Sequence, residues 1–404
     1  MTSARIKIDV DDSQLNAKLR QQELNMKQSF NRMSQSGSAL DNMVNRVKGS
    51  MGSMIPVASL ASAGLIFRQI LDTSREFSKE FSAAMAEVET ISTAVKNNNK
   101  GISDEIIKMA ANGKAGAIEL AKAYYQIVSA GHDGAKGLEL LSVASKAATA
   151  GVTDTKTAAD GLTTILNAWS KDASEAERVA DAMFTTVRLG KTTFGELSSQ
   201  IAQVAPLAAS MKIPFEQILS AVASLTFQGV PTAQAVTQIR SSLVNLNKVL
   251  PEGWQKMYTY QEALQKVYTM ANGSQNELRK LIPDIEGVSA VLGLSGEKAE
   301  TAAGHLNEFA KATGEMQTAY NRMMEEAENR WSQVHNKWMR ELKQIGDASL
   351  IASTGTAQFF NAMLTGMEDI QNKVPVINGF FDRIAGLKML GNNSIQAYLK
   401  ALVT

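Results

Sequence analysis

The sequence predicts an all-α protein, in which a multi-helix core domain is flanked by long amphipathic, coiled-coil-like helices and preceded by a short N-terminal strand. Three observations lead to this fold class. Between about residues 101 and 250, helix start and stop signals recur roughly every 12 to 20 residues, and no alternating strand pattern interrupts them. Two stretches, one near each end, carry apolar residues at heptad-like steps of three and four. Aromatic residues make up only 6% of the chain, whereas Ala and 19 Met supply much of its apolar content, which suits adaptable helix packing.

Residues 1–48 are expected to form a short strand and then a long helix. Ile6, Ile8 and Val10 alternate with polar residues, which is a strand pattern, and Asp11 to Ser13 can cap the helix that follows. A narrow apolar seam runs along this helix and consists of Leu15, Leu19, Met26, Phe30 and Met33. Such a seam is typical of a coiled coil or a partner-docking helix, and equally of an amphipathic helix packed on its own domain.

Residues 49–71 predict an apolar helical segment. The stretch from Gly49 to Phe67 carries no charge, and its length fits a bilayer core of roughly 30 Å. Pro56 and several serines dilute its apolar character. We therefore favour a helix buried against other helices over a permanent transmembrane span.

Residues 72–250 are predicted to form a compact helical core domain, in which a long helix over residues 72–95 precedes about seven shorter ones. Glycine closes several of these helices, as expected for a residue that tolerates the backbone of a helix C-terminus. Thr, Asp or Pro then begins the next helix. The helix breaks are assigned to Gly131, Gly151, Gly190 and Gly229.

Three segments complete the chain. Residues 251–296 are interrupted by Gly and Pro and predict an irregular helical linker. Residues 297–345 predict one long heptad-patterned helix, and residues 346–404 a low-charge helical tail. The seam of the long helix consists of Tyr320, Met324, Ala327, Trp331, Val334, Trp338, Leu342 and Ile345. Charges of both signs lie off this seam, which favours a self-associating or bundled helix, although two Trp could also belong to the core of a monomeric helical hairpin.

Composition argues against an enzyme. The chain has 41 Lys and Arg against 40 Asp and Glu, so it lacks the basic surplus of a nucleic-acid binder, and no sequence-specific nucleic-acid partner is expected. The absence of Cys excludes disulfides, thiolate metal sites and thiol catalysis. The three histidines, His132, His305 and His335, are scattered. We expect no catalytic residue, no cofactor and no metal site, and favour a structural protein.

Three motifs resemble functional sites, and each has a simpler structural explanation. Gly190-Lys191-Thr192 matches the end of a phosphate-binding loop, but Thr185 stands where that loop needs its first Gly. A helix stop followed by a Thr cap explains it. His132-Asp133 lies in a Gly-rich turn between helices and has no nucleophile in a matching context, which favours a structural linker. His335 has Met339 at i+4, where a metal site would need a second ligand.

The stretch from about residue 77 to residue 250 resembles the core region of phage tail tape-measure proteins. The segments that carry the resemblance occur in one order over nearly half the chain, although none is specific alone. They are Glu89 to Thr93, Glu119 to Ala123, Ile127 to Gly131, Leu140-Leu141, Ala148 to Gly151, Ala158 to Leu162, Glu175 to Asp181, Phe194 to Leu197, Val204 to Pro206, and Ile239 to Leu243 after the break at Gly229.

The resemblance implies a virion protein that lies inside the tail tube and sets tail length. Its implied partners are the tail tube protein, tail-assembly chaperones, a baseplate hub or distal tail protein, and a few further copies of itself. It would occupy the host cytoplasm during assembly and the tail lumen in the virion. It would leave the tail ahead of the DNA, with possible transient contact with the host membrane. No catalytic residue carries over, and the sequence is expected either to serve a short tail or to be part of a longer tape measure.

Two alternatives remain open at this point. One is a membrane-active helical protein, either a pore former or a secreted effector, that uses Gly49 to Phe67 and the low-charge C-terminus. The other is a hydrolase carried on a tail, which the missing nucleophile and metal constellations disfavour.

Overall fold

The computed structural model describes residues 60–351, with side chains from residue 73 to residue 343. All regular structure in this range is helical, which confirms the all-α class. The predicted N-terminal strand, the seam of Leu15 to Met33, residues 49–59 of the apolar segment and the tail beyond residue 351 lie outside the described residues. Within the described residues, contacts group residues 70–351 into one compact unit, which is described below.

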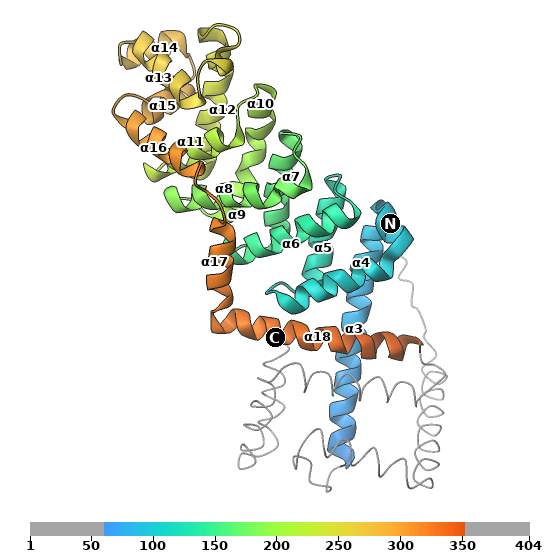
Figure 1. The fold of residues 1–404 in the computed structure, drawn as a ribbon. Coiled ribbons are helices and arrows are strands. Elements are labelled where there is room, and N and C mark those ends of the chain that lie inside the picture. The colour runs from blue at the N-terminus through green and yellow to red at the C-terminus, as the bar shows by residue number, and fades with distance from the viewer. Residues whose placement is uncertain (1–59, 352–404) are drawn as a thin grey trace, which may run out of the picture. The chain divides into compact units, whose positions relative to one another are not determined.

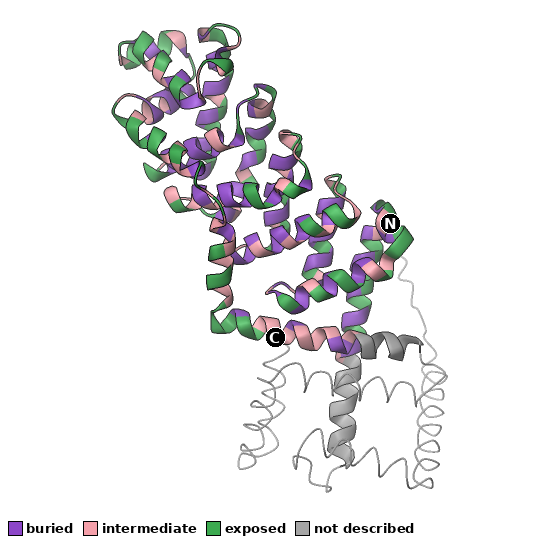
Figure 2. Cartoon of the chain, in the orientation of Figure 1, coloured by how far each residue is buried: buried purple, intermediate pink, exposed green. Residues whose placement is uncertain are grey.

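The first part of this unit is a succession of helices joined by short turns (Figure 1). These helices are α3 (Leu60–Ile91), α4 (Thr93–Asn112), α5 (Ala117–Ser129), α6 (Gly134–Ala150), α7 (Thr155–Ala168), α8 (Ala176–Leu189), α9 (Phe194–Gln200), α10 (Ala205–Ser210), α11 (Phe215–Phe227) and α12 (Thr232–Val249). We call α4–α12 the array. Buried positions lie along every helix of the array (Figure 2). Small residues such as Ala123, Ala144 and Ala180 are fully buried.

The array contains a tandem repeat, with each residue of the second copy 77 positions after its counterpart. Gly113-Lys114 and Glu119-Leu120 recur as Gly190-Lys191 and Glu196-Leu197. Gly113 ends α4 and Gly190 ends α8 with the same extended backbone, at φ −125° and −105°. The contacts of α4 with α6, of α5 with α7 and of α6 with α7 recur as those of α8 with α11, of α9 with α12 and of α11 with α12.

The two copies also share a hydrogen bond that fixes the start of their last helix. The Glu119 carboxylate accepts from the Thr155 backbone N–H at 3.1 Å and from its hydroxyl at 2.6 Å. In the second copy the Thr232 hydroxyl donates to Glu196 at 3.4 Å. Since these are the first residues of α7 and α12, one acidic side chain sets the position of the closing helix in each copy.

Residues 251–296 differ from the expected linker, because they pack into the same core. They contain α13 (Tyr260–Met270), α14 (Gln275–Leu281) and α15 (Ile285–Leu294), with short 3-10 turns at Trp254–Lys256 and Gly296–Lys298. Helix α15 lies against α12 and α13. Trp254 and Tyr260 are fully buried, and their polar atoms bond to Asn247 and Ser242. Glycine and proline shorten these helices without separating them from the core.

Residues 297–345 also differ from the expected single helix, because the structure divides them into three. These are α16 (Ala299–Phe309), α17 (Glu315–Met324) and α18 (Ala327–Ile351). Gly314 ends the first break with a left-handed backbone at φ 74°, which glycine adopts at little cost. Figure 1 shows these helices, in orange, returning along the array, and the contacts place α16 on α11, α17 on α6 and α8, and α18 on α4. We call α17 and α18 the strap.

Candidate functional site

The predicted seam of the long helix lies on the strap, where the corner between α17 and α18 divides it. Tyr320 and Met324 precede the corner, and the remaining seam residues follow it. Leu342 is fully buried, whereas Trp331 keeps 47% of its surface exposed. Val334 and Trp338 are half-buried, Ala327 is exposed, and the side chain of Ile345 lies outside the described residues. The residues predicted to form one apolar stripe therefore do not share one environment here.

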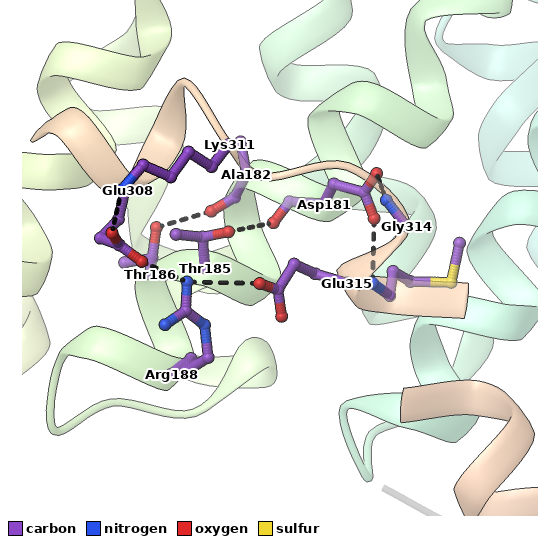
Figure 3. Close-up of polar contacts among 10 residues, drawn as sticks. Asp181, Ala182, Thr185, Thr186, Arg188, Glu308, Lys311, Gly314 and Glu315 are labelled. Carbon is purple, nitrogen blue, oxygen red and sulfur yellow. Dashed lines mark hydrogen bonds and ion pairs between the residues drawn. The ribbon is translucent and has the colours of Figure 1, made fainter. Parts of the chain in front are cut away.

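Asp181 of α8 anchors the start of the strap. Its buried carboxylate accepts from the backbone N–H groups of Gly314 at 2.7 Å and Met316 at 2.9 Å (Figure 3). Helix α17 has no capping side chain of its own. A carboxylate at a helix N-terminus satisfies otherwise unpaired N–H groups and complements the helix dipole. Asp181 thus caps a helix that lies more than a hundred residues further along the chain.

Arg188 adds ion pairs beside this cap. Its guanidinium lies 3.4 Å from Glu308 at the end of α16 and 3.3 Å from Glu315 at the start of α17 (Figure 3). All three side chains are partly exposed, so each pair contributes little stability alone. Their effect is to hold the α16–α17 turn against α8.

Asn336 fixes α18 to the loop between α4 and α5. Its buried side-chain amide donates to the carbonyls of Gly113, Lys114 and Ala115 at 3.0–3.2 Å. Nearby, the Gln333 amide donates to the carbonyl of Asn112 at 3.0 Å. Ser74 of α3 donates to the carbonyl of Leu342. Polar groups therefore hold α18 where α4 ends and where α3 passes.

Acid is expected to loosen the docking of α18. Burial lowers the pKa of His335 from its ordinary value of 6.5, because it penalises the charged imidazolium. His335 therefore takes up a proton less readily in the docked helix than in a released one. Its contribution to the stability of docking is complete well above pH 6.5 and is lost progressively as the pH falls below that value. Hydrogen exchange of α18, corrected for the intrinsic pH effect, should rise between about pH 7.5 and 5.5. His335→Gln should flatten this rise, and an identical rise in both proteins would contradict the assignment to His335.

The other motifs noted in the sequence lie at helix ends. Gly190 is the C-cap of α8, and Thr193 begins α9 with a reciprocal cap to Glu196, which leaves no phosphate-binding loop between them. His132 bonds to Asn167, and Asp133 caps α6. Among the assigned breaks, Gly151 is the C-cap of α6, whereas Gly131 and Gly229 follow α5 and α11 with positive φ.

A shallow pocket lies beside Trp169, Phe215 and Lys212, and two of its charged lining residues, Arg178 and Glu216, pair with each other. Arg178 stacks 5.2 Å from the Phe215 ring centre and forms ion pairs with Glu175 and Glu216. Within the part of the chain that the structure describes, no cluster of three or more His, Asp or Glu is placed to hold a metal ion. No helix among the described residues is long and apolar enough to cross a membrane.

Comparison with known proteins gives matches to phage tail proteins. Residues 103–259 match the family described as phage-related minor tail protein. The probable tape measure protein of Clostridium phage phiCD119 is 26% identical over 326 residues, which cover 72% of this chain and 34% of that protein. The tape measure protein of Pneumococcus phage Dp-1 is 23% identical over 299 residues, which cover 73% of this chain and 24% of that protein. No solved structure matches.

These matches confirm the resemblance to phage tail tape-measure proteins and support a phage tail protein. The chain spans about a third of the first relative's length and about a quarter of the second's. The family match covers both copies of the repeat from α4 onward and ends just before α13. The strap lies beyond it.

Proposed function

We propose that this chain, a relative of phage tail tape-measure proteins, fixes the length of the tail tube and scaffolds tail assembly inside its lumen. On this proposal it is released at infection and assists genome delivery through the host envelope. The observation that carries the proposal is the similarity to two tape measure proteins, each over more than 70% of this chain. A helix supplies about 1.5 Å of length per residue, which suits a ruler.

The proposed partners are the tail tube protein, tail-assembly chaperones and a baseplate hub or distal tail protein. A few copies of the chain would lie side by side in the lumen and associate through the seam of Tyr320 to Ile345. The chain would occupy the host cytoplasm during assembly and the virion tail afterwards. The formal net charge of +1 supports movement through a tube, because neither a positively nor a negatively charged tube wall would attract the chain strongly.

Changing the length of α18 tests the ruler. Four heptads inserted after Trp331 should lengthen the tail by about 42 Å, because each added helical residue contributes about 1.5 Å. Removing one or two heptads between Glu297 and Ile345 should shorten it in proportion. Tail length is measured by electron microscopy of purified particles, and Ser332→Ala, off the seam, serves as a control that leaves both chain length and seam unchanged. Particles that assemble normally with tails of unchanged length would exclude this function.

A further inference from the structure

We propose that the strap is releasable, and that on release α17 and α18 join into one continuous helix from Glu315 to Ile351. The docked strap would then be a stored form of the chain and the continuous helix its extended form. This inference rests on the proposed function, because a ruler acts through an extended helix. The inference adds that the continuous helix forms only after the strap has left the array.

The first support is that polar contacts fix the path of the strap over the array. Among its described residues, only Met316 belongs to the main apolar core, and Ala319, Tyr320 and Met339 pack against it partly buried. The attachments that define its path are the Asp181 cap, the ion pairs of Arg188 and the Asn336 amide. Water can replace each of these polar bonds when the strap leaves, and the fully buried apolar side chains of its described part that release has to expose are Met316 and Leu342.

The second support is a conflict between the corner and its own sequence. The corner lies at Glu325 and Glu326, within the run Arg322-Met323-Met324-Glu325-Glu326-Ala327-Glu328, in which every residue is a strong helix former. No Gly or Pro stops the helix there. Glu325 keeps right-handed helical angles, with φ −76° and ψ −21°, so few backbone angles separate the corner from a helix. Local preference thus opposes the bend, and the docked position has to impose it.

The third support is that the docked position supplies the contacts that keep the bend. Asp181 sets the start of α17, and Asn336 sets the position of α18. At the corner itself, the Asn329 amide donates to the Met323 carbonyl at 2.6 Å, and this side chain is buried. When the strap lifts off, Asn329 reaches water, and the carbonyl can accept an ordinary helical hydrogen bond instead.

The fourth support is the seam. Its steps of three and four residues place Tyr320, Trp331 and Leu342 on one face only when the helix is continuous. In the docked strap the corner separates Tyr320 from Trp331, and Leu342 is buried. Docking and the continuous seam therefore exclude each other.

Loss of the Asp181 cap should release the strap. The chain has no Cys, so Thr318→Cys with Ser332→Cys permits two spin labels, one on each side of the corner. A continuous helix would set these positions about 21 Å apart, and the docked bend sets them closer. In this background Asp181→Ala should shift the label distances to about 21 Å. It should also raise hydrogen exchange over residues 315–343 by about tenfold to a hundredfold, as expected for loss of a buried charged acceptor.

Asp154→Ala is the matched control, because Asp154 caps α7 within the array through the Thr157 N–H at 2.8 Å. It should loosen α7 and leave the label distance unchanged. Asn336→Ala is the second release variant if Asp181→Ala does not fold, and it should shift the same distance. An unchanged distance in the release variants, or a strap that loosens while the corner stays bent, would overturn the inference. If tail length follows the added heptads but the corner never straightens, the inference that the strap is released is wrong, whereas the proposed function still holds.

Discussion

Gly161→Val is expected to destabilise the array by about 2–3 kcal/mol, because α7 and α9 approach each other too closely at this position for a side chain. A Cβ at Gly161 would lie 2.5 Å from the Ser198 Oγ, 2.7 Å from its Cβ and 2.9 Å from its Cα. Rotation of Ser198 can move the hydroxyl but not the Cα, so the α9 backbone has to shift. This contact joins the last helix of the first repeat to the second repeat. Urea unfolding should show a lower midpoint with an unchanged slope.

Alanine at two helical glycines gives the control. Gly304, inside α16, has no atom within 4 Å of the added Cβ, so Gly304→Ala should stabilise that helix by about 0.5–1 kcal/mol through helix propensity alone. Gly161→Ala gains the same propensity but meets the α9 backbone, and it should destabilise the chain. The two substitutions should therefore have opposite signs. If both substitutions stabilise the chain, the distance between α7 and α9 at Gly161 must be larger than in the structure.

The fold class was predictable because helix ends carry local signals. Asp154 and Thr193 cap helices within one turn of themselves, and Gly151 and Gly190 end helices that the chain pattern already marks. The same local signals misled for residues 251–296, where glycine and proline shorten helices but burial of Trp254 keeps the segment in the core. Burial depends on residues far away in the sequence, which a break signal does not report.

The repeat left a sequence signal that analysis of helix ends did not use. A Gly-Lys pair with Glu-Leu beginning six residues after the Gly occurs at Gly113 and again at Gly190, and only a search for equal spacing reveals the repeat. The strap left no such signal. Asp181 lies 133 residues before Gly314, and Asn336 lies more than 220 residues after Gly113. The corner at Glu325 lies where propensity predicts continuous helix, so only tertiary contacts could place it.

Asp133, which forms with His132 a pair that resembles a catalytic site, has a structural role in the fold. Its carboxylate accepts from the Ser92 hydroxyl at 2.6 Å, the Ala94 N–H at 3.0 Å and the Gly134 N–H at 2.8 Å. It therefore joins the start of α4 to the start of α6. Asp133→Ala should lower the free energy of unfolding by about 2–3 kcal/mol, because these donors lose a charged acceptor together. Urea unfolding at neutral pH measures this loss.

The stabilisation that the Asp133 carboxylate provides should depend on pH. Burial alone would raise the pKa of Asp133, but the hydrogen bonds from Ser92, Ala94 and Gly134 outweigh it and hold the pKa below its ordinary value of 3.8. Folding therefore favours the ionised form, so this stabilisation is complete well above pH 3.8 and is lost as the pH falls through the lowered value. The stability gap between the natural chain and Asp133→Ala should narrow in acid. Asp160→Ala, at an exposed position on α7, should show neither the loss at neutral pH nor the narrowing. A gap that stays constant from neutral pH to about pH 3 would mean that the side chain acts through its shape rather than its charge.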